Sequence, residues 1–562
     1  MGFAACAALT SSCSQGAPAQ TSPQTMTLGV QTHFAQGWPA TRLDLARESG
    51  APSLRDSVPW ARVEAVPGRY KFEGPGVAAL DSFCRKGGSL LLVAVPLNPL
   101  YDGGGALRSA DAKAAFAGYI AALQDHFASC LVAIEIGNEI NSMNSRQLFR
   151  PGETGADPLR EYVDLVRTAR ETLRTRGGTA KILGGSSNMI ATGFLDSLFA
   201  RGLLDAADAL AVHPYRSQAE NLDVELAHLA DVMRRRGKPL PVWASEFSDN
   251  YPMPEMAAPQ LVKAATLLAA GGVEAAHWYA LVDQKWFRNM GLYDADGRTK
   301  PAAQAFGLVQ RDLLVHGRPQ RIDVGDPNVR LYRFGTDAWV AWGASGRVAF
   351  DASARLLDAR GQPLSGTGAE LNNDPVIALR SARPTFTPGP VLADSLLGYG
   401  SGDWRYLARK ADGTERTLPW LDGQWTTYHG DRFLRPLWIG DVAGAPAGEG
   451  TGAVHAIIRY TAPAARKVSI AVCIDKQAGG DGIDVALRRG KTDLAAALVT
   501  ASQRFAVREV ALAAGDTVDL VVGPNVKAGR DGFRYRIRIY AEPHVPAADC
   551  PARAVPVYPA KI

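Results

Sequence analysis

From Thr27 to about Leu314, short apolar runs alternate with longer stretches that carry apolar residues three and four positions apart. Short apolar runs are typical of buried parallel strands, and the three-and-four spacing is typical of amphipathic helices. The stretches 110–129 and 159–176 are the clearest helices. Eight runs are strand candidates: Thr27–Val30, Pro52–Arg55, Leu90–Val95, Leu131–Ile136, Ile182–Leu183, Ala209–Val212, Val242–Ala244 and Ala275–Tyr279.

Eight strands with helices between them, in one stretch of about 290 residues, predict an α/β fold, a (β/α)8 TIM barrel over residues 27–314. An open, doubly wound parallel sheet is the alternative. It is disfavoured because no glycine-rich phosphate-binding loop follows the first strand.

After the barrel the pattern changes to short runs in which apolar and polar residues alternate, separated by Gly and Asp turns. This pattern is typical of antiparallel sheets. We expect a small β-sandwich packed on the barrel over residues 315–382, a stiff proline-rich linker over Arg383–Pro390, and a C-terminal all-β domain of jelly-roll type over 391–545. A proline-containing tail, 546–562, is expected to run over the surface.

Composition narrows the range of functions. Hydrophobic residues make up 46% of the 562-residue chain and charged residues 21%, which fits a globular protein with sizeable cores. The net charge of +5 is spread thinly, without a run of Lys and Arg, so the sequence indicates no nucleic-acid partner. No apolar stretch of membrane-spanning length follows the N-terminal region, and we expect a monomer.

The first 26 residues have the composition of an export signal or of a disordered leader. Gly2–Leu9 is small and apolar, and Ala17–Ala19 offers a cleavage site. Thr10–Cys13 resembles a lipoprotein box, although Thr stands where Leu is usual. We favour export, to the periplasm, to the outer membrane by a lipid anchor, or to the outside of the cell.

Outside that leader the chain has four cysteines in two regional pairs. Cys84 and Cys130 each precede a strand candidate and could meet at the bottom of the barrel, and Cys473 and Cys550 lie in the C-terminal region. Four cysteines allow three pairings. Disulfides and free buried thiols are equally compatible with the sequence.

Two glutamates close two of the strand candidates. Glu139 ends the run 131–139, and Glu246 ends the run 241–246. The carboxyl ends of barrel strands meet at the rim where active sites form. Two carboxylates on one rim are the minimum equipment for hydrolysing a glycosidic bond, so the sequence predicts an enzyme that acts on sugars.

The residues around these glutamates carry a family resemblance. Gly137-Asn138-Glu139 and Ala244-Ser245-Glu246 resemble the two catalytic motifs of clan A glycoside hydrolases, and the segments 54–72 and 291–303 resemble glycoside hydrolase family 39. The resemblance covers about 350 residues and, within that family, is greatest to bacterial enzymes that cut biofilm exopolysaccharide. Ile140 stands where many relatives have proline, which leaves the shape of that loop open.

The resemblance implies a role for each of these residues. Glu139 would be the acid/base and Glu246 the nucleophile of a retaining mechanism, with the carboxylates about 5–5.5 Å apart. Asn138 would bind the sugar 2-hydroxyl, and Arg55 would favour the ionised form of Glu246. We expect Glu139 to lie where its neutral form survives near neutral pH.

Other residues are weaker candidates. His213 and Tyr215 follow the sixth strand and would orient the nucleophile, and Trp278 would form an apolar platform under the sugar. Ordinary loop or core positions are the alternative for all of them. Further candidates lie on predicted rim loops: His33, Trp38, Asn98, Asn141, Asn144, Asp249, Asn250, Lys285 and Trp286.

No metal-binding motif occurs, and we expect no cofactor. A Gly-rich loop near the C-terminus nevertheless carries three carboxylates of the kind that bind Ca²⁺: Asp475, Asp481 and Asp484. Four tryptophans of the same domain could bind polysaccharide or belong to its core: Trp404, Trp420, Trp425 and Trp438.

The leading hypothesis is an exported retaining β-glycoside hydrolase that acts within the chains of a bacterial exopolysaccharide or biofilm matrix. An inactive carbohydrate-binding or matrix-organising protein is one alternative, and the joint presence of Glu139, Asn138, Glu246, Arg55 and Tyr215 argues against it. A transglycosylase is the other, since it would use the same residues and differ only in excluding water from the second step.

Overall fold

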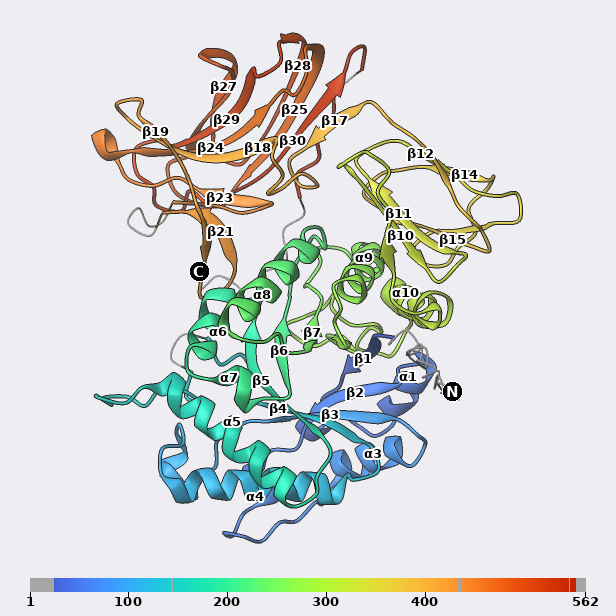
Figure 1. Ribbon diagram of the computed structural model, residues 1–562, viewed down its shortest axis with the longest axis vertical. Coiled ribbons are helices and arrows are strands. Elements are labelled where there is room, and N and C mark those ends of the chain that lie inside the picture. The colour runs from blue at the N-terminus through green and yellow to red at the C-terminus, as the bar shows by residue number, and fades with distance from the viewer. Residues whose placement is uncertain (1–24, 143–144, 432–436, 545, 552–562) are drawn as a thin grey trace, which may run out of the picture.

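A computed structural model describes residues 25–142, 145–431, 437–544 and 546–551. The chain begins with a closed barrel of eight parallel strands surrounded by helices and continues into antiparallel, all-β sheets (Figure 1). The predicted fold class is therefore confirmed. The predicted leader lies outside the described residues, except for its last two positions. Among the described residues, no helix is both long and apolar enough to cross a membrane.

The barrel strands follow one another in order, and the last one pairs with the first. Each lies within a few residues of its predicted place. The strands are β1 (Thr27–Gln31), β2 (Ser53–Ser57), β3 (Ser89–Ala94), β4 (Leu131–Ile136), β5 (Lys181–Asn188), β6 (Ala209–His213), β7 (Val242–Phe247) and β8 (Ala275–Trp278).

Helices cover the outside of this barrel. The helix α5 shows how the sequence sets their bounds: the Asp157 side chain accepts the N–H groups of Leu159 and Arg160, and Pro158 occupies the first turn, where it displaces no helical hydrogen bond. The helices are α1 (Arg42–Glu48), α2 (Trp60–Val63), α3 (Pro75–Cys84), α4 (Ala110–His126), α5 (Pro158–Thr175), α6 (Thr192–Phe199), α7 (Leu203–Ala206), α8 (Leu222–Arg236), α9 (Ala257–Ala270) and α10 (Pro301–Leu308).

Alternation along the strands makes the barrel interior apolar at one end and charged at the other. On β4, Ile134 and Ile136 belong to the large core shared with the helices, whereas Ala133 belongs to a separate interior cluster with Leu91 and Trp243. Glu135 lies two positions after Ala133, so it is on the same inward face of β4 but nearer the strand's carboxyl end. The interior thus changes from apolar to charged toward the rim.

The segment after the barrel forms a small sandwich. One sheet has the order β13-β15-β11-β10-β9 and the other β14-β12-β16. Its strands are β9 (Gln320–Arg321), β10 (Val329–Phe334), β11 (Ala338–Gly343), β12 (Arg347–Ala349), β13 (Arg355–Leu357), β14 (Gly368–Glu370), β15 (Val376–Leu379) and β16 (Thr385–Thr387). The predicted stiff linker over Arg383–Pro390 is wrong in part, because Thr385–Thr387 forms the strand β16 and pairs with β12.

The strands β10 and β11 of the five-stranded sheet are buried on both faces, because one face packs in the sandwich and the other against the barrel. Leu331 and Trp339 pack in the sandwich's own core, whereas Tyr332 and Val340, each one position later on the same strand, pack with the barrel core. Because successive side chains of a strand point to opposite faces, each of these strands contributes to both cores.

The C-terminal region is a larger sandwich of two antiparallel sheets. One has the order β20-β21-β22-β23-β30-β25-β28, with β17 also paired to β30, and the other the order β19-β18-β24-β29-β26-β27. Both contribute to one core. The strands are β17 (Val391–Asp394), β18 (Trp404–Lys410), β19 (Glu415–Thr417), β20 (Trp420–Asp422), β21 (Thr427–Gly430), β22 (Trp438–Ile439), β23 (Ala443–Ala445), β24 (Val454–Thr461), β25 (Arg466–Lys476), β26 (Ile483–Arg489), β27 (Thr492–Val499), β28 (Ser502–Leu512), β29 (Thr517–Pro524) and β30 (Phe533–Ala541).

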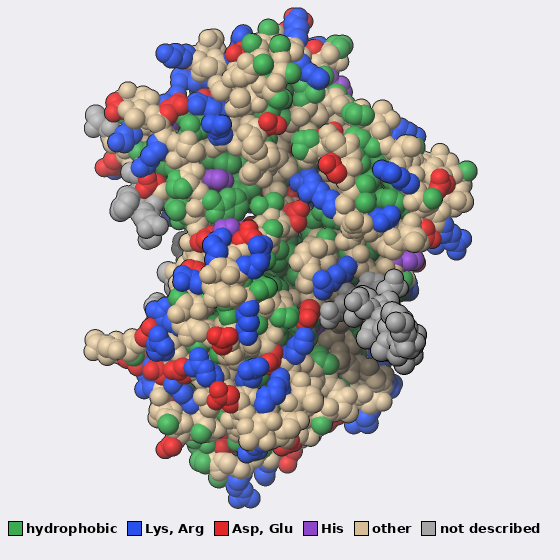
Figure 2. All heavy atoms as spheres, viewed as in Figure 1, with side chains coloured by type: hydrophobic (Ala, Val, Ile, Leu, Met, Phe, Trp, Pro, Cys, Tyr) green, Lys and Arg blue, Asp and Glu red, His purple; other side chains and the backbone are tan. Residues whose placement is uncertain are grey.

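Both regional cysteine pairs form disulfides. Cys84 joins Cys130 next to the barrel strands β3 and β4, and Cys473 of β25 joins Cys550 of the tail. Among the four tryptophans of the C-terminal sandwich, Trp404 belongs to the core, Trp420 and Trp438 are half-buried, and Trp425 is exposed. Figure 2 shows basic and acidic side chains interspersed over the face it presents.

Candidate active site

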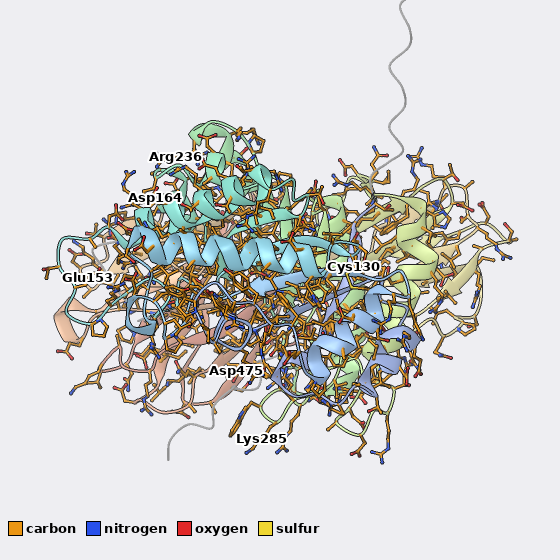
Figure 3. The ribbon with its side chains drawn as sticks, turned by 90° about the horizontal axis from the view of Figure 1, so that it is seen from below. Cys130, Glu153, Asp164, Arg236, Lys285 and Asp475 are labelled. Carbon is orange, nitrogen blue, oxygen red and sulfur yellow. A yellow bond between two sulfur atoms is a disulfide. The ribbon has the colours of Figure 1, made fainter. Side chains whose placement is uncertain are left out.

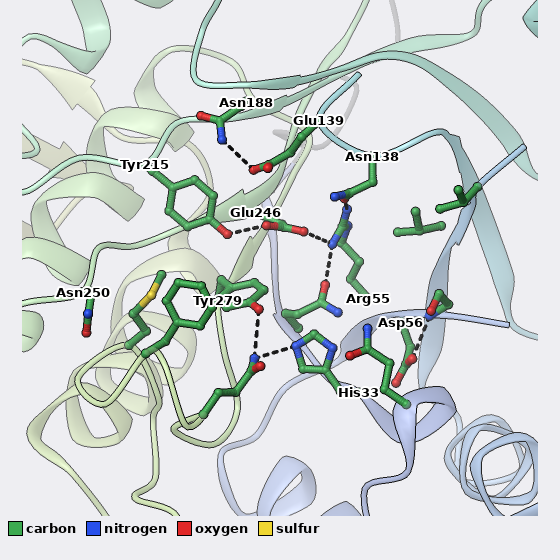
Figure 4. A pocket seen from close by; sticks show the side chains of 18 of the residues that line it. His33, Arg55, Asp56, Asn138, Glu139, Asn188, Tyr215, Glu246, Asn250 and Tyr279 are labelled. Carbon is green, nitrogen blue, oxygen red and sulfur yellow. Dashed lines mark hydrogen bonds and ion pairs between the residues drawn. The ribbon is translucent and has the colours of Figure 1, made fainter. Parts of the chain in front are cut away.

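A cavity of about 760 Å³ opens at the carboxyl end of the barrel strands (Figure 4). Both candidate catalytic residues line it, and so do residues that end or follow β2, β5, β6 and β8. Its lining is Gln31, His33, Gln36, Arg55, Asp56, Ser57, Val93, Val95, Asn138, Glu139, Asn188, Tyr215, Glu246, Asp249, Asn250, Tyr279, Gln284, Phe287 and Met290.

The two glutamates face each other across this cavity. One carboxylate oxygen of Glu139, one of Glu246 and one ring nitrogen of His213 all lie within 4.8 Å of one another. The Glu246 side chain is 8% exposed and the Glu139 side chain is 27% exposed, so the Glu139 carboxylate is more accessible to a ligand. The predicted pair is therefore brought together at short range.

Arg55 on β2 is the centre of the charged network. Its Nε donates to Glu135 at 2.9 Å, its Nη1 to Glu246, and its Nη2 to the side-chain oxygen Oδ1 of Asn138 at 2.9 Å. Burial lowers the pKa of Arg55, but the neighbouring charges of Glu135 and Glu246 outweigh it and raise the pKa above its ordinary value. The predicted contact between Arg55 and Glu246 is present in the structure.

His213 ends β6 and contacts three carboxylates. Its Nε2 lies 3.1 Å from Glu135, and its Nδ1 lies 3.3 Å from Glu139 and 3.5 Å from Glu246. Burial lowers the pKa of His213, but the charge of Glu246 and hydrogen bonds to Glu135 and Glu139 raise it to about 10. The imidazole is therefore a cation at neutral pH.

This cation overturns one expectation. Burial raises the pKa of Glu139, but the hydrogen bond from His213 and the Asn188 amide, 2.9 Å away, leave the pKa below its ordinary value. The neutral form of Glu139 is therefore not favoured. The proton is held instead on His213, 3.3 Å from the carboxylate.

The backbone around Glu139 is unusual. Glu139 has φ +46°, in the left-handed region that favours glycine, and Gly137 has φ +85°. The Ile140 N–H donates to the Ser186 carbonyl at 3.0 Å, and its side chain is fully buried. A proline at position 140 has no N–H and could not make that hydrogen bond. The loop after Glu139 is therefore held by a contact that needs a residue other than proline.

Tyr215 and Asn138 complete the immediate surroundings. The Tyr215 hydroxyl donates to Glu246, opposite the bond from Arg55, so the carboxylate is held on both oxygens (Figure 4). Burial and the charge of Glu246 raise the pKa of Tyr215 well above its ordinary value, which keeps the hydroxyl a donor. Because Arg55 engages the Asn138 oxygen, the Asn138 amide is the group left to donate to a ligand.

Several rim candidates lie where a ligand could reach them. His33, Asp249 and Asn250 line the cavity. Burial and the Arg55 charge lower the pKa of His33 to about 4, and its Nε2 lies 2.7 Å from the Gln284 amide. Burial raises the pKa of Asp249 to about 6.

Trp278 does not line the cavity. Its ring is fully buried in the barrel core, packs edge-on against Phe247, and donates its N–H to the Met290 carbonyl at 2.8 Å. The next residue, Tyr279, lines the cavity instead. The aromatic side chain that a sugar could contact is therefore one position further along the chain than expected.

The remaining candidates lie elsewhere. Asn98 is buried and donates to the Glu64 carbonyl at 3.1 Å, and Trp38 packs edge-on against His33 outside the cavity lining. Lys285 lies over the ring of Trp286 at 4.9 Å, and both are exposed on the loop after β8. Figure 3 shows Lys285 at the edge of the molecule. Asn141 binds a different part of the chain, as described below. Asn144 lies outside the described residues.

Sequence reasoning missed two residues of the charged network. Glu135 is fully buried, and Arg55 and His213 bind it. Its signal was present, since a carboxylate inside an apolar strand needs a partner. Asn188, which donates to Glu139, ends a strand that was predicted to stop at Leu183.

In the described part of the chain, the one group of at least three side chains close enough to hold an ion is Glu139, His213 and Glu246. Asp475, Asp481 and Asp484 do not form such a group, and the Asp481 carboxylate accepts the N–H groups of Val526 and Lys527 instead.

Similarity to known proteins is found in structure. A family 39 glycoside hydrolase from the gut symbiont Bacteroides cellulosilyticus WH2 has a TM-score of 0.54 at 18% identity, over 64% of this chain and 81% of that one. A family 39 β-xylosidase from Caulobacter crescentus has a TM-score of 0.45 at 13% identity, over 64% and 97%. An exo-β-1,4-mannosidase from Opitutaceae bacterium strain TAV5 has a TM-score of 0.40 at 18% identity, over 51% and 60%.

No protein-family model matches the sequence, and no curated protein matches it either. At identities this low the structural likeness shows a shared fold. The sequence resemblance to family 39 is thus matched by a likeness in fold to a family 39 glycoside hydrolase. The narrower resemblance to enzymes that cut exopolysaccharide stays a prediction.

Proposed function

We propose that the protein is a retaining β-glycoside hydrolase with Glu246 as nucleophile and Glu139 as acid/base. One observation carries the proposal: oxygens of the two carboxylates lie within 4.8 Å of each other on the rim of the barrel. Retaining enzymes hold their carboxyl groups about 5–5.5 Å apart, whereas inverting enzymes leave about 6.5–9.5 Å for a water molecule.

In the first step a Glu246 oxygen attacks the anomeric carbon, and the bond to the leaving oxygen breaks as Glu139 protonates that oxygen. Arg55 and Tyr215 hold the attacking carboxylate in place and supply its counter-charge. The Asn138 amide would donate to the sugar 2-hydroxyl, an interaction that strengthens in the transition state; the bond from Arg55 to the Asn138 side-chain oxygen supports this, since it leaves the amide as the donor.

The proton for this step is shared with His213. The imidazolium Nδ1 lies 3.3 Å from Glu139, so the pair together holds the one proton that the leaving oxygen needs. In the second step Glu139 takes a proton from water, the water oxygen attacks the anomeric carbon, and the bond to Glu246 breaks. The starting charges are then restored.

We further propose that the substrate is a bacterial exopolysaccharide cut within its chain. The sequence resemblance to family 39 supports this, because within that family it is greatest to bacterial enzymes that cut biofilm exopolysaccharide. The two disulfides support a working place outside the cytoplasm, in the periplasm, on the outer membrane or outside the cell. The protein would act as a monomer, without a cofactor.

Incubation with a panel of matrix polysaccharides and aryl glycosides, followed by mass analysis of the products, tests the proposal. A ladder of oligosaccharides from wild type, and none from Glu246→Gln, is expected. Release of monomers or dimers alone would replace internal cleavage by action at chain ends. Products longer than the substrate would indicate a transglycosylase, and binding without any product would leave a carbohydrate-binding protein.

A further inference from the structure

A hairpin of the C-terminal sandwich reaches back to the barrel beside the cavity. It consists of β20, the turn 423–426 and β21, residues 420–430, and is called here the docking hairpin. In Figure 1 it extends from the sandwich toward α6 and α8. Its contacts go to α6, to α8 and to the loop after β4, which carries Glu139.

Two contacts fix the docking hairpin on the helices. His228 of α8 lies 2.6 Å from the Asp422 carboxylate. On α6, Gly193 lies so close to the hairpin backbone that a Cβ there would be 2.4 Å from the Asp422 carbonyl oxygen. A glycine at this position therefore permits the approach.

The third contact is a reciprocal pair of hydrogen bonds between Gln424 and Asn141. The Gln424 side-chain amide donates to the main-chain carbonyl of Asn141 at 3.0 Å, and the Asn141 side-chain amide donates to the main-chain carbonyl of Gln424 at 2.9 Å. Asn141 is 1% exposed. Its buried polar groups need partners, because an unsatisfied buried amide costs free energy that a bonded one does not.

From Asn141 the hydrogen bonds continue to the acid/base. Its side-chain oxygen accepts the Asn188 N–H at 2.8 Å, and its amide also donates to the Asn188 carbonyl at 3.1 Å. The Asn188 amide then donates to Glu139 at 2.9 Å. Residues from two domains thus form one continuous chain that ends on the carboxylate.

We propose that Gln424 is a positioning residue for Glu139, so that the C-terminal sandwich completes the acid/base half of the active site. The role of Glu139 as acid/base is that of the proposed function, and the hydrogen bonds from Gln424 to Glu139 are those of the structure. Glu139 has a left-handed backbone, and among the described residues its carboxylate hydrogen-bonds to the side chains of His213 and Asn188. Such a conformation persists when surrounding contacts hold it.

The kinetic consequence falls on one partner of the catalytic pair. Glu246 is held by Arg55 and Tyr215. The hydrogen bonds that connect the docking hairpin to Glu139 do not pass through either of these residues. Gln424→Ala should therefore lower kcat/KM about tenfold for substrates whose leaving group needs a proton. For aryl glycosides that leave without a proton, the first step should change by less than about threefold.

Amide hydrogen exchange of the full-length protein tests the inference without reference to activity. In Gln424→Ala, exchange in the peptide covering 137–142 should become faster, because the hydrogen bond from the Gln424 side chain to the main-chain carbonyl of Asn141 is lost. Gln424→Glu removes the donor while keeping the size, and should behave alike. Thr426→Ala is the matched control, since that hydroxyl bonds only within the docking hairpin in the described contacts.

The two measurements separate the inference from the function on which it rests. Faster exchange together with a loss confined to poor leaving groups supports both. Faster exchange with no glycosidase activity in wild type supports the anchoring and removes the proposed function. Unchanged exchange in both Gln424 variants, or an equal loss on all leaving groups, overturns the inference.

Discussion

Two clusters of buried charge in this molecule use the same residue types for different ends. At the barrel rim, two cations, Arg55 and His213, meet three carboxylates, and the group borders a cavity. Where the two sandwiches meet, Asp394 of β17 meets Arg536 and Arg538 of β30. There the Asn373 side chain also accepts from both arginines.

The difference lies in how completely the carboxylate oxygens are engaged. Both Asp394 oxygens accept from arginine, and one also accepts the Leu396 N–H at 3.0 Å. Burial raises the pKa of Asp394, but the two arginines outweigh it and lower the pKa to about 2. At the rim, Glu139 keeps an exposed fraction of 27% and a strained backbone. The cluster of Asp394, Arg536 and Arg538, called here the closed cluster, holds domains together. The cluster of Arg55, His213 and three glutamates, called here the open cluster, retains reactivity.

The largest expected effect is on the open cluster. Glu246→Gln removes the attacking carboxylate but keeps its shape, so turnover should fall by on the order of 10⁴–10⁶-fold, as for other nucleophile variants. The melting temperature should stay close to that of wild type, because Glu135 still pairs with Arg55. Steady-state kinetics on an activated aryl glycoside and thermal unfolding check this. Near-normal turnover would remove Glu246 from the mechanism.

The closed cluster should show the opposite pattern. Asp394→Asn leaves two buried guanidinium groups without their counter-ion, which should reduce the free energy of unfolding by about 3–5 kcal/mol. Turnover of the folded fraction should not change. In wild type this contribution is present above about pH 4 and lost as the pH falls toward about 2, following the lowered pKa. Denaturant unfolding across that range measures it.

An exposed ion pair supplies the control for Asp394. Arg347 lies 2.9 Å from Glu370, and both side chains are largely exposed. Arg347→Ala should change stability by no more than about 1 kcal/mol. If it destabilised the protein as much as Asp394→Asn, burial would not be what distinguishes the closed cluster.

In the cluster at the rim, the stability that His213 contributes should be lost at alkaline pH. The pKa of His213 is raised from 6.5 to about 10, so its contribution to stability is complete below pH 6.5 and is lost as the pH rises toward 10. His213→Gln should be less stable than wild type at pH 6.5, and the gap should close by pH 10. Unfolding curves at five pH values test this. Parallel curves for the two proteins would mean that His213 carries no extra proton.

A smaller effect should follow from Tyr215→Phe. It removes one donor from Glu246 but leaves Arg55 on the other oxygen, so kcat/KM should fall by about 10- to 100-fold. The loss should be similar for good and poor leaving groups, because the nucleophile acts whatever leaves. A loss confined to poor leaving groups would assign Tyr215 to the acid/base instead.

The barrel and its two glutamates could be predicted because local patterns encode them. Apolar runs gave the strands, and a carboxylate at a strand's end must reach the rim. Trp278 was assigned to the wrong side because the pattern did not show on which face the last residue of β8 lies, and Tyr279 took the expected place. Asn141 and Gln424 are 283 residues apart, and no local pattern connects them.

The expectation that Glu139 is neutral was wrong for a related reason. Whether Glu139 is neutral depends on His213, which reaches it from another strand and is itself held by Glu135. Each residue was visible in the sequence, but the balance between burial and paired charge follows from distances within one network.

The central claim is the division of roles between Glu139 and Glu246, and azide rescue tests it most directly. With an activated aryl glycoside, Glu139→Ala should form the glycosyl-enzyme but lack the base for the second step, so added azide should restore turnover and give a β-glycosyl azide. Glu246→Ala should give an α-glycosyl azide or none, because azide would then replace the nucleophile itself. NMR of the isolated azides reads the configuration. A β-glycosyl azide from Glu246→Ala, and none from Glu139→Ala, would show that the roles are reversed.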